Sequence, residues 1–555
     1  MSNKEVRRQA RQHTLRRRAF LQLGALAVTG TSLAQAVNTP TVLAKGLTMP
    51  FLQLEEATIV ELQDAMKSGQ ITSRQLTEMY IERIHQINEQ GPTLKAILEI
   101  NPDALTIADQ LDKERHEKGP RSILHGIPIL LKDNIATADK MQTTAGSLAL
   151  VGSHPPRDAF VAHGLRNAGA VILGKTNLSE WANFRSSSSS SGWSGRGGQA
   201  LNPYVLDRTP CGSSSGSGIS VSANLAAATL GTETDGSIVC PSSNNSVVGI
   251  KPTVGLTSRA GVIPIAHSQD TVGPICRTVA DAAAVLGAMV GVDPRDPATS
   301  ASQGKFYTDY TKFLDPDGLK GARIGVPRQV YFGYSDKTDA IANAAIQRLA
   351  ELGATIVDPA DIPTAQQMAS SNSELTVLLF EFKADLNKYL SELVDSPVHT
   401  LEDIIAFNTQ HASRELPYFG QELFQQAQAT TDLNDPKYLA ALAEDQRLSR
   451  QEGIDAVMNQ YHLDALVAPT SCPPWTIDLI DGDHDLGGSS QPAALAGYPA
   501  ISVPAGYSFG ELPVGITFFG RAFSEPTLIK LAYAFEQGTK VRHKPKFLPQ
   551  VPGLK

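Results

Sequence analysis

The chain of 555 residues has few cysteines and, after its first 36 residues, no long apolar run. Cys211, Cys240, Cys276 and Cys472 lack Cys-x-x-Cys spacing, so the sequence indicates neither a zinc site nor a disulfide scaffold. We expect these cysteines to be small apolar core residues, and their spacing leaves open whether any of them pair. No segment after residue 36 is apolar for long enough to cross a membrane, and no internal repeat is present.

The first 36 residues have the features of an export signal. An arginine-rich start precedes a short apolar stretch and Ala34-Gln35-Ala36, a small-residue cleavage pattern. Within this segment, Arg17-Arg18-Ala19-Phe20-Leu21 matches the twin-arginine export signal. A membrane anchor is the competing interpretation, but the apolar stretch is short and rich in glycine and threonine. The sequence therefore predicts a periplasmic or extracellular protein with no membrane attachment once residues 1–36 are removed.

The rest of the chain is acidic. The full chain has a net charge of −8 at pH 7, and residues 1–36 carry +6 because Lys4 and six arginines face only Glu5. Removing them leaves −14. A surface of this charge repels nucleic acid phosphates and favours solubility. We expect a soluble globular monomer without a nucleic acid partner.

Predicted strands and helices alternate along the chain. The apolar segments 125–135 and 171–177 are typical of buried strands, and Thr72-Ser73-Arg74-Gln75 resembles a capping box that begins a helix. This alternation favours one sheet covered by helices on both faces. We divide the chain into a tether (37–50), the main domain (51–545) with a helix-rich insertion near the site (365–455), and a C-terminal tail (546–555).

Three polar side chains stand beside apolar segments. Lys132 ends a predicted strand, where burial disfavours the ammonium form, lowers the pKa and allows a neutral amine to act as a base. Ser213 lies in "CGSSSGSG" (211–218), and Ser237 ends "TETDGS" (232–237). Gly236 allows a tight turn whose backbone N–H groups can face an oxyanion. Taken singly, each has a simpler interpretation: a surface lysine, a flexible linker and a plain turn.

The combination of segments is far more specific. "GIPILLKDNI", "CGSSSGSG", "GTETDGSI" and "VVGIKPTVGLTSRAGVIP" resemble, in order and spacing, the amidase signature family. "LSEWANF" and "SGWSGRGGQ" are most similar to the bacterial peptide amidases within it. The resemblance spans nearly the whole chain after the export signal. It implies one large α/β/α domain with a mixed central β-sheet, and a serine amidohydrolase that works without a cofactor.

The resemblance also implies the roles of individual residues. By position, the family's catalytic lysine corresponds to Lys132, its bridging serine, which follows an unusual cis peptide, to Ser213, and its nucleophile to Ser237. In this set, the neutral lysine takes a proton from the bridging serine, which relays one from the nucleophile. The family's oxyanion hole corresponds to the backbone N–H groups of Thr234, Asp235, Gly236 and Ser237.

The sequence departs from the family pattern near the site. Cys211 stands where "GGSS" usually begins, and the usual "TDxGGS" has Glu233 and Asp235 substituted. Many relatives carry an arginine shortly after the nucleophile, whereas Val239 and Cys240 stand here. The site therefore lacks one cation that could hold a substrate carboxylate. This favours the C-terminal amide of a peptide as substrate, with a small aliphatic, aromatic or amino-acid amide as the alternative.

Other motifs have weaker support. Gly212–Gly216 matches the G-x-S-x-G elbow with Ser214 as nucleophile, but Pro210 stands where a strand should lead into the elbow. Ser302–Lys305 matches S-x-x-K without its partner motifs. We expect Ser186–Ser191 to form a surface loop.

Possible metal ligands also lack a suitable pattern. The carboxylates of 481–485 do not follow the calcium-loop spacing, so a polar turn is the better interpretation. His125, His163 and His267 are scattered, and we expect them at the surface or at helix ends. We therefore expect no metal.

Two further functions are compatible with this family. A non-enzymatic binding protein would share the fold, but all three catalytic positions are intact here. An amidotransferase component would work on charged tRNA in the cytosol with partner proteins, which the export signal and the acidic charge both oppose.

Overall fold

The computed structural model of the protein describes residues 54–553. The predicted export signal (1–36) and tether (37–50) lie outside the described residues. A mixed sheet of eleven strands runs through the described chain, as the sequence predicts. In spatial order its strands are β1 (Ile97–Ile100), β3 (Val171–Thr176), β2 (Pro128–Lys132), β6 (Ala228–Glu233), β8 (Thr271–Cys276), β7 (Val248–Lys251), β12 (Ala500–Ser508), β13 (Leu512–Phe519), β11 (Ala465–Pro469), β9 (Arg323–Gly325) and β10 (Thr355–Val357).

The directions of the central strands place several strand ends at the same edge of the sheet. β2 runs parallel to β3 on one side and to β6 on the other, whereas β8 runs antiparallel to β6. The carboxyl ends of β2, β3 and β6 therefore meet at one edge, together with the start of β8. Lys132 is the last residue of β2, so it lies at this edge.

Helices cover both faces of the sheet. Every residue of β2, β3, β6 and β8 is buried, which requires cover on each face. One group of helices packs on β6, β7, β12 and β13: α6 (Ser215–Ser222) and α7 (Val239–Asn244). The helices of a second group pack against one another and against β8, β12 and β13. They are α8 (Val279–Gly287), α9 (Asp336–Glu351) and α18 (Glu525–Thr539).

The N-terminal part of the described chain adds a further group of helices beside β1, β2 and β3. The predicted capping box is present: the Thr72 side chain accepts from the Gln75 N–H, and the Gln75 side chain accepts from the Thr72 N–H. It begins α3, as the sequence predicts. The group consists of α2 (Ile59–Lys67), α3 (Ser73–Ile84), α4 (Ala104–Lys118) and α5 (Phe160–Asn167).

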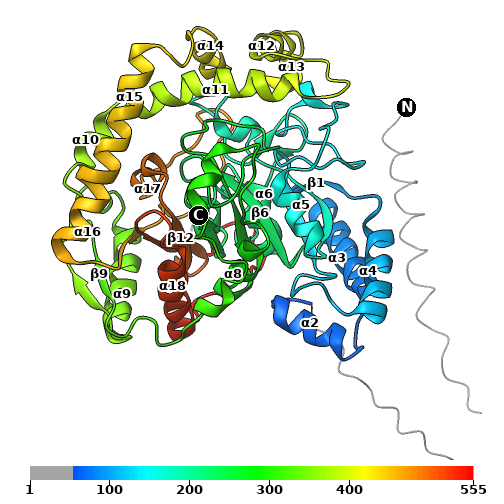
Figure 1. The fold of residues 1–555 in the computed structure, drawn as a ribbon, viewed down its shortest axis with the longest axis horizontal. Coiled ribbons are helices and arrows are strands. Elements are labelled where there is room, and N and C mark those ends of the chain that lie inside the picture. The colour runs from blue at the N-terminus through cyan, green and yellow to red at the C-terminus, as the bar shows by residue number, and fades with distance from the viewer. Residues whose placement is uncertain (1–53, 554–555) are drawn as a thin grey trace, which may run out of the picture. The chain divides into compact units, whose positions relative to one another are not determined.

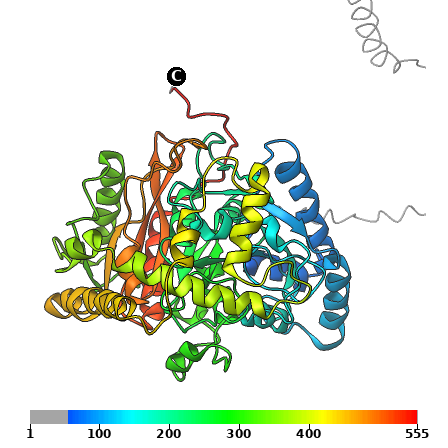
Figure 2. The ribbon, with the colours of Figure 1, turned by 90° about the horizontal axis from the view of Figure 1, so that it is seen from above.

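The insertion predicted at 365–455 consists of helices that continue to residue 461. Figure 1 shows α11 beside α12 and α14, and Figure 2 shows the same region from above. The helices are α10 (Ala365–Ser370), α11 (Ser373–Ser391), α12 (Leu401–Gln410), α13 (Ala412–Glu415), α14 (Glu422–Gln428), α15 (Pro436–Gln446), a π-helical segment (Arg447–Ile454) and α16 (Asp455–Tyr461). The remaining elements are the strand pair β4 (Trp193–Ser194) and β5 (Gly198–Gln199), α17 (Gln491–Ala496), and short π- or 3₁₀-helices at 85–89, 148–150, 180–183, 297–302 and 311–313.

The last described residues pair with a segment from the middle of the chain. The Leu548 N–H donates to the Tyr204 carbonyl oxygen at 3.1 Å, and the Leu206 N–H donates to the Leu548 carbonyl oxygen at 2.7 Å. The predicted C-terminal tail is thus joined to the segment that leads into Cys211. None of the helices between residues 54 and 553 combines the length and the apolar character needed to span a bilayer.

Candidate active site

Lys132 is fully buried at the end of β2. Its Nζ donates to Ser213 Oγ at 2.8 Å, to Thr232 Oγ1 at 2.8 Å and to the Thr232 carbonyl oxygen at 3.2 Å. Burial lowers the pKa of Lys132 to about 7, although the carboxyl groups of Asp270 and Glu233 favour the charged form. An amine with this pKa is largely neutral at slightly alkaline pH and can take a proton from a hydroxyl group.

Ser213 lies in a loop that is packed on every side. It is fully buried, and the peptide bond between Gly212 and Ser213 is cis. The Ser213 carbonyl oxygen accepts from the Ser179 N–H at 3.1 Å. A Cβ atom at Gly212 would lie 2.2 Å from Ser179 Oγ, so only glycine fits there. The "CGSSSGSG" segment is therefore a fixed part of the site and no flexible linker.

Ser237 lies in the turn between β6 and α7. The Ser214 N–H donates to the Ser237 carbonyl oxygen at 3.1 Å, which joins the Ser213 loop to this turn. Gly236 has a φ of +77°, a left-handed conformation that favours glycine, and its carbonyl oxygen accepts from the Cys240 N–H at 2.8 Å. The structure thus brings together the segments of all three residues that the sequence predicts to be catalytic.

The turn also presents backbone donors without partners. Within residues 54–553, no protein group accepts a hydrogen bond from the N–H of Asp235, Gly236 or Ser237. Consecutive free N–H groups around a left-handed glycine can bind the oxygen of a tetrahedral intermediate. The predicted oxyanion hole at 234–237 is chemically possible in this geometry.

Two buried carboxyl groups hold the turn in place. Glu233 Oε2 accepts from the N–H groups of Ile238 and Val239 at 2.7 and 2.9 Å, at the start of α7. Asp270 Oδ1 accepts from Thr234 Oγ1 at 2.6 Å. Burial raises the pKa of both carboxyl groups, and that of Asp270 reaches about 6. Neither residue could be assigned this role from the sequence, because their partners follow no motif.

α11 brings a further carboxyl group to the turn. Glu374 accepts from Gln269 Nε2 at 3.1 Å and from Gln491 Nε2 at 3.0 Å. Burial and the adjacent Glu374 carboxyl raise the pKa of Asp235 to about 8, and burial also raises the pKa of Glu374. Each carboxyl group therefore disfavours a second negative charge beside it. Sequence analysis missed Glu374, Gln269 and Gln491, which come from three separate segments.

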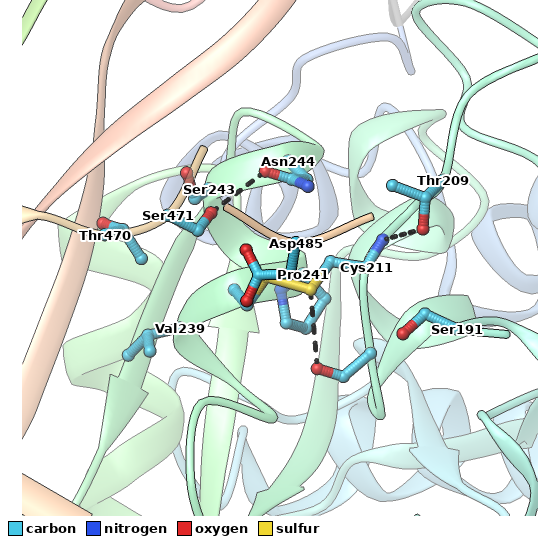
Figure 3. The surroundings of a disulfide bond; sticks show 12 residues. Ser191, Thr209, Cys211, Val239, Pro241, Ser243, Asn244, Thr470, Ser471 and Asp485 are labelled. Carbon is cyan, nitrogen blue, oxygen red and sulfur yellow. Dashed lines mark hydrogen bonds between the residues drawn. A yellow bond between two sulfur atoms is a disulfide. The ribbon is translucent and has the colours of Figure 1, made fainter. Parts of the chain in front are cut away.

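Cys211 and Cys240 form a disulfide bond, shown in Figure 3. This corrects our expectation that all four cysteines are small apolar core residues. Cys211 precedes Ser213 by two positions, Cys240 follows Ser237 by three, and their Cα atoms lie 5.9 Å apart. A separation of 29 residues carries no local signal, and only the fold brings the two segments together. The other two cysteines are free and buried.

The hydroxyl group of Ser214, the alternative nucleophile, is hydrogen-bonded to strand β6. Its Oγ donates to the Thr232 carbonyl oxygen at 3.0 Å and accepts from the Thr232 N–H at 3.2 Å, and the residue is fully buried. A hydroxyl fixed in this way is a structural link between α6 and β6. Ser302 lies in a 3₁₀-helical turn, where its Oγ donates to the Thr299 carbonyl oxygen at 2.7 Å.

The three histidines occupy different environments. His163 is exposed on α5, as expected, but His125 is fully buried with Nε2 2.9 Å from the Leu111 carbonyl oxygen, which corrects the expectation of a surface or helix-end position. His267 is exposed, and its Nδ1 lies 2.8 Å from Asp385 Oδ2 while Nε2 lies 3.3 Å from Glu381 Oε1. His267, Glu381 and Asp385 are near enough to share a ligand, a proximity that their separation in sequence hides.

A cavity of about 480 Å³ lies beside this group. Its lining includes Asp270, His267, Asp385 and Tyr389. Because Asp270 also contacts Thr234, the cavity adjoins the segment that leads into the Ser237 turn. The insertion helix α11 therefore forms part of a wall close to the site.

The serine-rich run is a surface loop only in its middle. Ser187 and Ser188 are exposed, whereas Ser191 is buried. The Asp483 carboxylate accepts from the Ser191 N–H at 3.0 Å and from Trp475 Nε1 at 3.1 Å. Asp483 thus fixes the run to the 478–488 loop, a role that suits the predicted polar turn.

Comparisons with known proteins find related amidases over most of the chain. A family model described as "Amidase" matches residues 75–529. The crystal structure of the native peptide amidase from Stenotrophomonas maltophilia is 50% identical, with a TM-score of 0.84 and coverage of 89% of this chain and 99% of that chain. A structure of an amidase family protein from Bacillus anthracis is 38% identical, with a TM-score of 0.80 and coverage of 89% and 93%.

A further relative, known from its sequence, is a plant protein. A protein of Arabidopsis thaliana described as "Probable amidase" is 48% identical over 501 residues, covering 89% of this chain and 92% of its own length. The match therefore extends over nearly the full length of both proteins. The chain belongs to the amidase signature family and is an amide-hydrolysing enzyme.

Proposed function

We propose that the protein hydrolyses the C-terminal amides of peptides to the free acid and ammonia, with Ser237 as nucleophile, Ser213 as bridging residue and Lys132 as base. The observation that carries this proposal is the buried hydrogen bond of 2.8 Å between Lys132 Nζ and Ser213 Oγ, in surroundings that lower the lysine pKa to about 7. The likeness to structures described as peptide amidase supports the choice of substrate.

The first half of the reaction forms an acyl-enzyme. Neutral Lys132 accepts the Ser213 hydroxyl proton, and Ser213 accepts the proton of Ser237 as the Ser237 oxygen attacks the amide carbonyl carbon. The carbonyl oxygen becomes negatively charged, and the free N–H groups of the 235–237 turn stabilise it. The tetrahedral intermediate collapses when the carbon–nitrogen bond breaks. The proton returned through Ser213 goes to the nitrogen, which leaves as ammonia.

The second half releases the acid. A water molecule attacks the ester carbonyl of the acyl-enzyme, and its proton passes through Ser213 to Lys132. Collapse of the second tetrahedral intermediate returns a proton to the Ser237 oxygen and frees the carboxylic acid. Since the lysine accepts and returns one proton in each half, the enzyme ends in its starting state without a cofactor.

The residues that follow the nucleophile support an uncharged substrate end. Val239 and Cys240 begin α7, so no cation stands there to bind a carboxylate. The buried carboxyl groups of Asp235 and Glu374 also lie at this turn, and burial raises the pKa of both. A substrate carboxylate would add a further acidic group beside them, whereas a primary carboxamide is uncharged and adds none.

The test is mass spectrometry of products from a small substrate panel. The purified protein and its Ser237→Ala variant are incubated with a C-terminally amidated peptide, the same peptide containing internal Asn and Gln, and a simple aromatic amide. We expect the wild type to convert only the terminal amide, with a mass gain of about 1 Da, and the variant to convert nothing.

Other outcomes point to other functions. Cleavage of the aromatic amide alone would indicate a hydrolase of small amides. No conversion of any substrate by the wild type would favour a binding protein on the same fold. Turnover by Ser237→Ala would overturn the assignment of the nucleophile.

We further propose that residues 1–36 direct export by the twin-arginine route. The Arg17–Leu21 motif supports this, and a disulfide such as Cys211–Cys240 suits an oxidising compartment. We expect Arg17→Lys/Arg18→Lys to retain the protein in the cytoplasm, as measured by fractionation and immunoblotting. An unchanged distribution would contradict this route.

A further inference from the structure

We propose that the Cys211–Cys240 disulfide is a positioning crosslink for catalysis. It sets the relative placement of the segments that carry Ser213 and Ser237, and turnover depends on it although the fold does not. This inference rests on the proposed function of the two serines. It assigns Cys211 and Cys240 as positioning residues, since neither sulfur takes part in the chemistry.

On the Ser213 side, the crosslink ends at a segment with little freedom. Cys211 has a φ of +55°, and its carbonyl oxygen accepts from Ser215 Oγ at 2.6 Å. Gly212 is held against Ser179, and the Ser213 carbonyl oxygen accepts from the Ser179 N–H. A shift of Cys211 is therefore passed on to Ser213, because Gly212 between them is packed against Ser179.

On the Ser237 side, one hydrogen bond links the crosslink to the oxyanion turn. The Cys240 N–H donates to the Gly236 carbonyl oxygen at 2.8 Å, and Gly236 immediately precedes Ser237. The direction of the Ser237 N–H, a donor of the proposed oxyanion hole, depends on the peptide unit of Gly236. The disulfide thus fixes both halves of the catalytic pair from outside the reacting atoms.

Other contacts already keep the two segments together. Asn245 Nδ2, just beyond α7, donates to the Pro210 carbonyl oxygen at 2.9 Å. Asn202 Nδ2 donates to the carbonyl oxygens of Thr209 and Asn244 at 3.0 and 2.7 Å, so it bridges both segments. These side-chain bonds lie farther from the serines in sequence than the disulfide does, whereas the 3.1 Å backbone bond from the Ser214 N–H to the Ser237 carbonyl oxygen lies nearer. Because they hold the fold, loss of the disulfide should loosen the site without unfolding the protein.

The surroundings of the disulfide preserve this pairing. Cys211 and Cys240 pack with Cys472 and Trp475 in one apolar cluster, and Figure 3 shows the polar groups around them. Burial raises the pKa of the Cys472 thiol to about 12, and its Sγ donates to Asp485 Oδ1 at 3.4 Å. Thiol–disulfide exchange needs a thiolate, so this third cysteine does not exchange with the disulfide under neutral conditions.

The test compares the double variant Cys211→Ser/Cys240→Ser with a matched control. The control, Cys276→Ser/Cys472→Ser, removes two buried thiols and keeps the crosslink. Each protein is measured for kcat and KM on a C-terminally amidated peptide, for folding by circular dichroism, and for the rate at which a fluorophosphonate probe labels Ser237, followed by mass spectrometry. The probe reports on the nucleophile without requiring the correct substrate.

We expect the crosslink variant to fold, to keep its KM within about twofold, and to lose about tenfold or more in both kcat and the labelling rate, because a displacement of the order of 1 Å has large kinetic effects. The control should stay close to wild type. Equal labelling rates in the two variants, or failure of the crosslink variant to fold, would overturn the inference alone. Absence of label on Ser237 in the wild type would overturn the proposed function, and the inference with it.

Discussion

Lys132 and Lys175 occupy neighbouring strands and similar surroundings, yet only one of them lies in the candidate site. Both are fully buried, and burial lowers the pKa of Lys132 to about 7 and that of Lys175 to about 8. Lys132 Nζ donates to the hydroxyl of Ser213, whereas Lys175 Nζ donates to the Ile135 carbonyl oxygen at 2.7 Å and to Thr143 Oγ1 at 2.8 Å. The two lysines differ in their hydrogen-bond acceptors: only the acceptor of Lys132 belongs to the loop that is joined to the Ser237 turn.

A third buried lysine follows the pattern of Lys175. Burial lowers the pKa of Lys251 to about 8, and its Nζ donates to the Tyr498 carbonyl oxygen at 2.7 Å. A carbonyl oxygen has no proton to give. A lowered pKa alone therefore does not identify a catalytic base; the base is the lysine whose hydroxyl partner belongs to a loop joined to the Ser237 turn.

The largest expected effect comes from removing one amine or the other. Lys132→Met should lower kcat/KM by at least about 10⁴-fold, because no other group can take the Ser213 proton. Lys175→Met should retain turnover within a few-fold and lower the free energy of unfolding by about 1–3 kcal/mol, since the Ile135 carbonyl loses its donor. Steady-state kinetics and denaturant titration measure both. Equal losses of activity would remove the distinction between the lysines.

The next comparison concerns adjacent serines. Ser213→Ala should lower kcat/KM by about 10³-fold or more, because the proton relay is interrupted. Ser214→Ala removes two hydrogen bonds to Thr232 and should cost about 1–3 kcal/mol of stability while leaving most of the turnover. The thermal midpoint and the kinetics of both variants separate the two roles. If Ser214→Ala were the inactive variant, the elbow interpretation would have to be restored.

The smallest effect is a dependence on pH. Only neutral Lys132 accepts a proton, so activity falls when the amine becomes charged below its pKa. With a pKa of about 7, the neutral fraction increases from about one tenth at pH 6 to about nine tenths at pH 8, and kcat/KM should increase about tenfold. Lys175→Met should show the same profile. A profile that is flat over this range would contradict the role of Lys132 as base.

Much of this site could be predicted because its parts lie close to strand ends and sequence motifs. The buried run before Lys132, the glycines around Ser213 and Gly236 in the turn each have a local physical reason. Alternation of strands and helices likewise predicts a covered sheet, and the structure has one. In these places, local sequence and final packing favour the same arrangement.

What could not be predicted depends on contacts between distant segments. The disulfide joins residues 29 positions apart, Glu374 reaches Asp235 from α11, and His125 is buried under segments that surround it. Nothing in a local pattern specifies these partners, because each is decided by how whole helices pack. A small apolar core residue was the simplest interpretation of Cys211. Only the folded chain places Cys240 close enough to form a disulfide bond with it.

The pairing of Leu548 with Tyr204 and Leu206 has a consequence for biosynthesis. The segment that enters the Cys211 loop obtains backbone partners from residues that are synthesised long after it. At about 5–20 residues per second, these partners emerge roughly 20–70 s after the segment itself. During that interval the nascent polypeptide already contains Lys132, Ser213 and Ser237. It still lacks the backbone hydrogen bonds that Leu548 forms with Tyr204 and Leu206. The enzyme's activity should therefore begin only after Leu548 has been synthesised.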